Sequence, residues 1–271
     1  MLKAASTNDF HGLLHMSKPS SPLRQIHIPE HSEVLNVMLH TVYNISPAAF
    51  TPTFHTLSSA LTQMHQTYGI DLQTWITPSR PLFDTMLSVA TQAPLELYAL
   101  AASLGLEELA KATSSHLLSY PLSNLPDDVG NQMGPIYLRK LFFLHLGRVE
   151  ALKRIVLQPP EPHPPLKSCP PESQQRLTEG WAISLADLVW EARPGSSHGA
   201  TYLCVGEAAY HACLPTDVST ASIEFALKGL GAQVTCPQCE TALRDRVNHV
   251  VKEWALVKVG FSSRFPRFPV P

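Results

Sequence analysis

The fold class is decided by residues 32–42, which read SEVLNVMLHTV. Their apolar side chains recur at spacings of three and four, the period of one face of an α-helix. Ser32 stands where it can cap the helix N-terminus, and Glu33 lies near the positive end of the helix dipole. The pattern returns over residues 53–68, so we predict two consecutive amphipathic helices.

The same periodicity extends along the chain on both sides of this stretch. Upstream, residues 1–16 fit a short amphipathic helix, and residues 25–28 alternate in polarity as a short strand that Pro29 ends. Gly105 is expected to end a helix as its C′ residue. We predict a mainly α fold (α+β), whose downstream helices cover residues 81–90, 94–104, 106–120, 135–158, 173–193, 201–213, 218–231 and 239–259.

Four of these patterns carry a resemblance to a known family. Residues 26–30 read I-x-I-P-E, residues 34–43 VLNVMLHTVY, residues 67–70 TYGI and residues 97–113 LYALAASLGLEELAKAT. Together they resemble the later part of a BTB/POZ domain, as found in the fungal proteins in which such a domain is followed by helices. The resemblance implies a partial BTB/POZ-like domain over residues 1–120, truncated at its N-terminus because the opening strands and first helix of the family are absent.

The rest of the chain is expected to be a helical C-terminal region interrupted by prolines. Seven of the thirteen residues from Pro159 to Pro171 are proline, which favours extended backbone and prevents helix. This segment is interpreted as a loop or linker, with a ligand for a proline-binding module as the alternative. The expected organisation is a helical extension at 121–158, a Pro-rich loop at 159–172, a helical region at 173–260 and a disordered tail at 261–271.

Composition excludes several classes of partner and location. The 271 residues carry a formal net charge of −2, and the isoelectric point is near 6.7. This balance gives no reason to expect binding to nucleic acid or to an anionic membrane. No apolar run approaches the roughly 20 residues that a membrane-spanning helix requires. Five cysteines without a signal peptide indicate a reducing compartment, so we expect a cytoplasmic or nuclear protein.

Gly195-Ser196-Ser197-His198-Gly199 matches the G-x-S-x-G pattern of serine hydrolases. That pattern works as a nucleophile only at a sharp strand-to-helix turn above a parallel sheet. The preceding residues have a helical pattern and no series of strands surrounds them, so Ser197 is interpreted as a turn residue. A hydrolase at Ser197 stays a minor alternative.

Cys236-Pro237-Gln238-Cys239 has the C-x-x-C spacing that lets two thiolates share one metal ion. A structural zinc site needs four ligands, and His211 and Cys213 are the upstream residues proposed to complete it. The alternative is a pair of packed free cysteines, and a redox pair would need a thioredoxin-like context that the sequence lacks.

These observations favour a non-catalytic protein–protein interaction module of the BTB/POZ type. The resemblance implies protein partners, including a second copy of the chain, a ubiquitin-ligase scaffold or a chromatin regulator. The competing interpretation is a zinc-stabilised regulatory protein with metal ligands His211, Cys213, Cys236 and Cys239. No other cofactor is expected.

Overall fold

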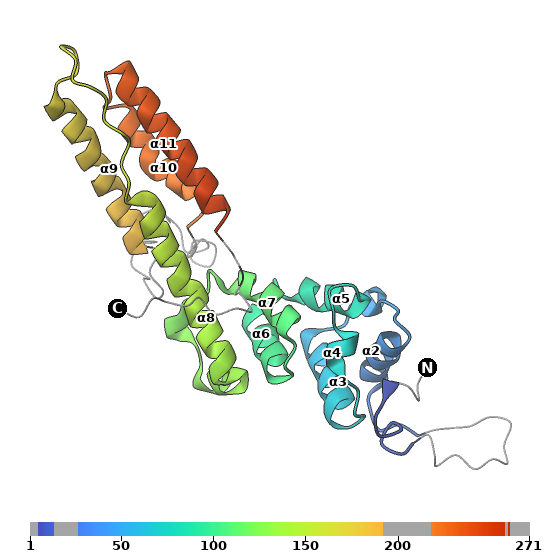
Figure 1. Cartoon of the computed structure of the whole chain (residues 1–271). Coiled ribbons are helices and arrows are strands. Elements are labelled where there is room, and N and C mark those ends of the chain that lie inside the picture. Colours follow the sequence, from blue (N-terminus) through green and yellow to red (C-terminus); the bar gives the residue numbers. More distant parts are fainter. Residues whose placement is uncertain (1–4, 14–26, 192–217, 258–259, 261–271) are drawn as a thin grey trace, which may run out of the picture. The chain divides into compact units, whose positions relative to one another are not determined.

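The computed structural model describes residues 5–13, 27–191, 218–257 and 260, and this part of the chain is mainly helical (Figure 1). The mainly α prediction is confirmed. Among the described residues, β pairing is limited to two isolated bridges, Ser6 with Ile70 and Leu166 with Cys169. The strand expected at residues 25–28 does not form at its two described residues, 27 and 28.

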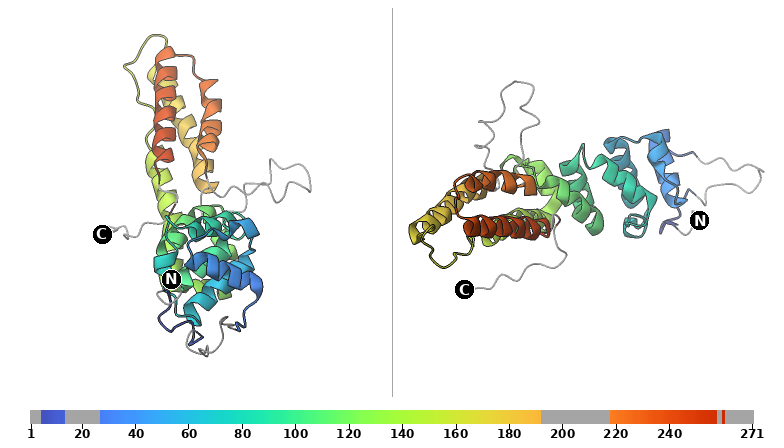
Figure 2. Two further views of the ribbon diagram at one scale, coloured as in Figure 1. Left: turned by 90° about the vertical axis from the view of Figure 1, so that its right-hand side faces the viewer. Right: turned by 90° about the horizontal axis from the view of Figure 1, so that it is seen from above.

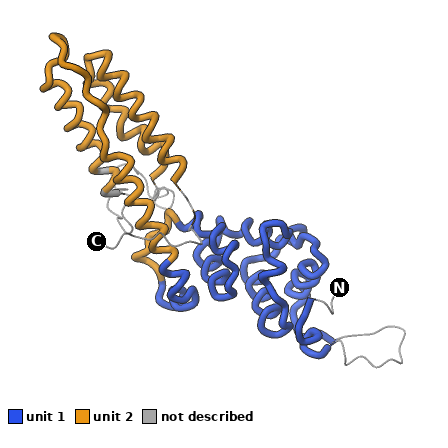
Figure 3. Tube along the Cα trace, viewed as in Figure 1, with its two compact units in different colours: residues 1–117, 126–139, 262–271 blue, residues 118–125, 140–261 orange. Residues whose placement is uncertain are grey.

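The described residues form two compact units (Figure 3). Unit 1 contains the described residues within 1–117 and 126–139, and unit 2 those within 118–125 and 140–261. The Pro159–Pro171 segment lies inside unit 2, so it does not connect one unit to the other.

Unit 1 is built from short helices with buried apolar faces. The helix pairs α2–α3 and α6–α7 pack closely. Its elements are α2 (Ser32–Val42), η1 (Pro47–Phe50), α3 (Phe54–Gln66), α4 (Leu72–Trp75), α5 (Pro81–Val89), α6 (Pro94–Ser103), α7 (Glu107–Ser114), η2 (Ser115–Leu117) and the first part of α8 (Asp127–Val156). The single turn α4 lies between the helices predicted over residues 53–68 and 81–90, where no helix was predicted.

Local sequence explains where several of these helices begin and end. The Thr53 side chain caps α3 by accepting a 3.2 Å hydrogen bond from the backbone N–H of Thr56. Gly105 follows α6 with φ +68°, a left-handed conformation that glycine adopts without strain, which confirms its predicted role. Ser32 is not the cap of α2, because the cap position is held by His31 without a side-chain hydrogen bond.

The helix predicted over residues 1–16 is wrong in the described residues 6–13. These residues form a bridge and a turn instead, with positive φ from Asp9 to Gly12. Polar contacts to the end of α3 explain the difference. The Ser6 hydroxyl donates to the backbone oxygen of Tyr68 at 2.6 Å, and the backbone N–H of Thr7 donates to that of Gly69 at 3.1 Å.

Helix α8 begins earlier than the sequence predicted. Within the helical extension expected at 121–158, the predicted helix covered only residues 135–158, yet a helical turn starts at Asp127 after Pro126 and runs to the break at Gly134. Gly134 has φ +72° and ψ 165°, and Pro135 restarts the helix at the predicted place.

In unit 2, four helices enclose one apolar core: the end of α8, α9 (Pro171–Glu191), α10 (Thr220–Gly231) and α11 (Pro237–Ala255). These helices run lengthwise beside one another (Figure 2). Unit 2 also contains η3 (Leu122–Asn124). The core residues are Leu152, Ile155, Val156, Trp181, Leu185, Leu188, Val218, Ile223, Leu227, Leu230, Leu243, Val250 and Trp254.

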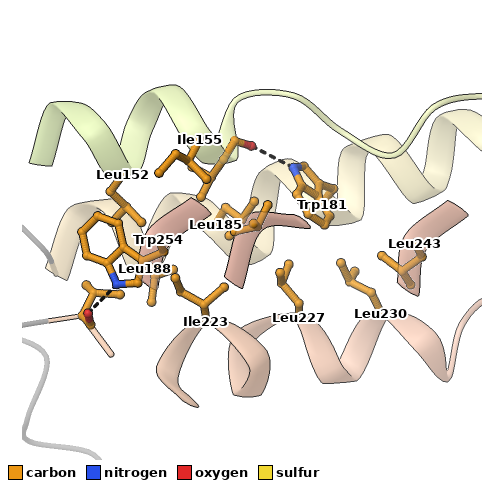
Figure 4. Packing of buried hydrophobic residues seen from close by; sticks show 13 residues of the cluster. Leu152, Ile155, Trp181, Leu185, Leu188, Ile223, Leu227, Leu230, Leu243 and Trp254 are labelled. Atoms are coloured by element: carbon orange, nitrogen blue, oxygen red, sulfur yellow. Dashed lines mark hydrogen bonds between the residues drawn. The ribbon is translucent and has the colours of Figure 1, made fainter. Parts of the chain in front are cut away.

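Both tryptophans in this core use the indole N–H to bind a backbone oxygen (Figure 4). Trp181 donates to Val156 at 3.0 Å and Trp254 donates to Val218 at 2.8 Å. Each bond satisfies a polar group that burial would otherwise leave without water. The guanidinium of Arg148 lies 4.6 Å from the ring centre of Trp254, a cation–π contact.

No described helix combines the length and the apolar character that crossing a bilayer requires.

Candidate metal centre

Four side chains of unit 2 lie close together, and two of them belong to the start of α11. The ribbon shows that α9 and α11 begin at the same end of the helix bundle (Figure 1). The four side chains are His163, Cys169, Cys236 and Cys239. The first two come from the Pro-rich connection between α8 and α9, and the other two from the start of α11. Two connections that are far apart in sequence therefore supply two donors each.

The first connection is shaped by prolines and by a tight turn. Leu166 and Cys169 exchange two backbone hydrogen bonds of 3.0 and 3.1 Å, which leaves Lys167 and Ser168 at the tip. This turn directs Cys169 inward, with 2% of its surface exposed. Arg246 of α11 fixes the start of the connection by donating to the backbone oxygen of Gln158 at 2.8 Å.

In the second connection, Cys236 is the N-cap residue of α11 and Pro237 its first helical residue. The first helical hydrogen bond joins the Glu240 N–H to the Cys236 oxygen at 2.9 Å. Because Cys239 lies in the first turn of the helix, both sulfurs lie near its positive end, where thiolates are stabilised.

The four donor atoms all lie within 4.8 Å of one another. The Sγ atoms of Cys169 and Cys239 are 3.6 Å apart, far longer than a disulfide bond, and all three cysteines are free. His163 Nε2 lies 3.4 Å from the sulfur of Cys236 and 3.2 Å from that of Cys239.

The tautomer of His163 suits a metal ligand. Its Nδ1 lies 2.7 Å from the backbone oxygen of Pro164 and donates its proton to that oxygen. Nε2 then carries a lone pair directed at the sulfurs. Metal-binding histidines almost always donate their second ring N–H to a carboxylate, a backbone carbonyl or a water, which fixes the orientation of the ring.

The thiols differ in how readily they lose a proton. The backbone N–H of Cys239, followed by that of Gln238, lowers the pKa of Cys236 to about 7 against the opposing effect of burial. Burial, and then the thiol of Cys169, raise the pKa of Cys239 to about 12. Burial also raises the pKa of Cys169. Cys236 is therefore the thiol most easily converted to the thiolate that a metal requires.

Apolar side chains and a cavity surround the sulfurs. Leu177 and Val234 pack against the three cysteines and limit the access of water. A cavity of about 330 Å³ adjoins the sulfurs, and Arg176 contributes to its wall. The group of four side chains could hold a metal ion, with three sulfur donors and one nitrogen donor.

The structure brings together part of the predicted ligand set. Cys236 and Cys239 belong to the group, whereas His211, Cys213 and the serine-hydrolase candidate Ser197 lie outside the described residues. The sequence prediction missed His163 and Cys169. The available signal was a cysteine and a histidine close together inside a proline-rich segment, where the prolines restrict the backbone.

Comparison with known proteins adds no relative to this description. No family model matches the chain, and no curated protein or solved structure is significantly similar to it.

Proposed function

We propose that His163, Cys169, Cys236 and Cys239 bind one zinc ion as a structural site. The distances between the donor atoms carry this proposal. A tetrahedral zinc with Zn–S bonds of about 2.3 Å and Zn–N bonds of about 2.0 Å has S···S edges near 3.8 Å and S···N edges near 3.5 Å. The observed distances of 3.6, 3.4 and 3.2 Å are close to those edges.

The donor set favours zinc and a structural role. Three thiolates and one imidazole match the Cys₃His class of zinc sites, whereas magnesium and calcium prefer oxygen ligands. Protein side chains occupy all four tetrahedral positions, which leaves no open position for a substrate or an activated water. The site therefore supports a non-catalytic protein in which the ion joins the Pro-rich connection to α11.

Elemental analysis of the purified chain tests this proposal. We expect about one zinc per chain, and we expect its loss in Cys169→Ser, because the third thiolate is removed. Cys213→Ser is the matched control, since it removes a cysteine outside the group of four. Zinc retained in Cys169→Ser, or lost only in Cys213→Ser, would contradict the ligand assignment.

A second proposal concerns unit 1, which we infer to be a protein–protein interaction module in the manner of the BTB/POZ domains that its sequence resembles. Support comes from exposed apolar side chains just after α2 and on η1, two elements that lie close together. Tyr43, Ile45 and Phe50 are 47–57% exposed, and large apolar clusters on a surface tend to mark interfaces. The proposed partner is a second copy of the chain, in a cytoplasmic or nuclear setting where thiols stay reduced.

Sedimentation velocity over a range of concentrations tests the second proposal. Phe50→Asp places a charge in the apolar cluster and is expected to abolish self-association. Phe225→Asp is the control, because Phe225 is an exposed phenylalanine of α10 in the other unit. A wild-type chain that stays monomeric at every concentration would refute self-association.

A further inference from the structure

The Pro-rich connection contains a segment whose backbone is restricted by its own sequence. Every residue from Pro159 to Pro165 is a proline or directly precedes one. Proline fixes φ near −65°, and the residue before a proline is driven away from helical values toward extended ones. Residues 159–165 accordingly contain no helix, strand or turn. The segment is therefore suited to the polyproline II conformation before any partner binds.

Burial divides this segment into anchored side chains, Pro160 and His163 among them, and exposed ones. His163 is half-buried and faces the cysteine sulfurs, whereas Pro162, Pro164, Pro165 and Lys167 are exposed. A polyproline II helix has three residues per turn, so residues 162 and 165 share one edge and residue 163 lies on another. The contacts of His163 with the sulfurs thus leave the edge with Pro162 and Pro165 turned to solvent.

We propose that this proline ridge, residues 161–167, is the docking site for an SH3-type domain. Such domains bind P-x-x-P segments in grooves lined by aromatic side chains and benefit from a ligand that is already extended. The ridge contains Pro162-His163-Pro164-Pro165-Leu166-Lys167, in which two prolines three residues apart are followed by a basic residue.

Charge defines the chemistry of the partner more closely. Lys167 stands at the exposed tip of the Leu166–Cys169 turn, at one end of the ridge, and Glu161 stands at the other. A partner with acidic side chains at one end of its aromatic groove would pair with Lys167. This pairing also sets the direction in which the ridge binds. Charged groups at the rim of an interface act in this way on orientation and specificity.

The position of His163 explains how one segment can serve both the metal centre and a partner. In a P-x-x-P ligand, some side chains point away from the groove, and His163 is directed toward the sulfurs rather than toward solvent. Two backbone constraints hold the end of the ridge near Lys167, namely the hydrogen bonds between Leu166 and Cys169. Both bonds join backbone atoms, none of which is a metal ligand, so docking does not require the ion.

Isothermal titration of the full chain with purified SH3 domains that select P-x-x-P-x-Lys peptides tests the proposal. A purified WW domain and a peptide of residues 157–170 are included in parallel. We expect micromolar binding of the chain to an SH3 domain. Pro165→Ala removes one proline ring from the groove and is expected to weaken binding about tenfold. Lys167→Gln removes the positive charge and is expected to weaken binding by a similar factor and to remove its salt dependence.

Pro126→Ala, at an exposed proline before α8, is the matched control and should leave the affinity unchanged. The proposal would be overturned if no SH3 domain of the set binds the chain, if the WW domain binds in place of the SH3 domains, or if both ridge variants bind like the wild type. Binding of the peptide but not of the chain would also overturn it, because the fold would then hide the ridge. Zinc content is measured on the same samples, so a failure of the metal proposal is distinguished from a failure of this one.

Discussion

Lowering the free zinc concentration should destabilise unit 2 by an amount that follows from the proposed site. In the connection over residues 157–170, Pro160 and Cys169 are buried and most other residues are exposed, so apolar packing contributes little to holding it. Zinc that binds the folded chain alone stabilises it by about 4 kcal/mol when its free concentration is 1,000 times the dissociation constant. The melting temperature of a unit of this size changes by roughly 3–5 °C for each kcal/mol of stability, so removal of zinc should lower it by roughly 12–20 °C.

Thermal scans by circular dichroism in zinc buffers measure this shift. The wild-type midpoint for unit 2 should rise with free zinc, whereas that of Cys239→Ser should stay low and constant. Cys204→Ser serves as the control, because Cys204 is not among the four side chains that meet at the site. A wild-type midpoint that is the same with and without zinc would refute the reasoning, and so would a Cys239→Ser chain that still responds to zinc.

Three further results are expected. Gly147→Ala should stabilise the chain by about 1 kcal/mol through helix propensity, because a Cβ there meets no atom within 4 Å. In urea titrations Gly180→Ala should gain less stability than Gly147→Ala, because its Cβ would lie 2.9 Å from Leu230 Cδ2. An equal gain in stability would contradict the close packing of α9 and α10. Burial, and then a hydrogen bond to the Glu30 carboxylate, raise the pKa of Tyr68. The contribution of Tyr68 to the stability of the fold is therefore complete below pH 10 and is lost as the pH rises further. Urea midpoints at pH 9 and 11 should therefore differ less in Tyr68→Phe than in the wild type, and an unchanged difference would argue against this cause. Trypsin should cleave after Lys167 faster once a chelator removes zinc, and mass spectrometry of the fragments should show this, whereas equal rates would mean that the ion does not hold the turn.

The helices could be predicted because their information is local. The spacing of apolar residues alone located α3, α9 and α10 to within a few residues of their observed ends. The prediction failed where contacts from elsewhere in the chain decide the structure. Residues 6–13 have helical spacing, but their polar groups bind the backbone after α3 and form a turn instead.

The candidate site shows the same division between local and distant information. Cys236 and Cys239 could be found because the C-x-x-C spacing places both sulfurs near one helix end. Their partners His163 and Cys169 lie more than sixty residues upstream, and no spacing rule connects the two segments. His211 and Cys213 were proposed as the upstream ligands, and they lie outside the described residues.

The meeting of these two connections has a consequence for the order in which unit 2 folds. Cys169 and Cys239 are 70 residues apart in the chain, so their approach is one of the slowest kinds of contact to form. Closing a loop of that length costs about 4 kcal/mol of chain entropy in the unfolded state. A thiol-binding ion that captured both connections early would remove that cost before α9, α10 and α11 had assembled. Refolding of unit 2 should then be faster with zinc present from the start than with zinc added afterwards.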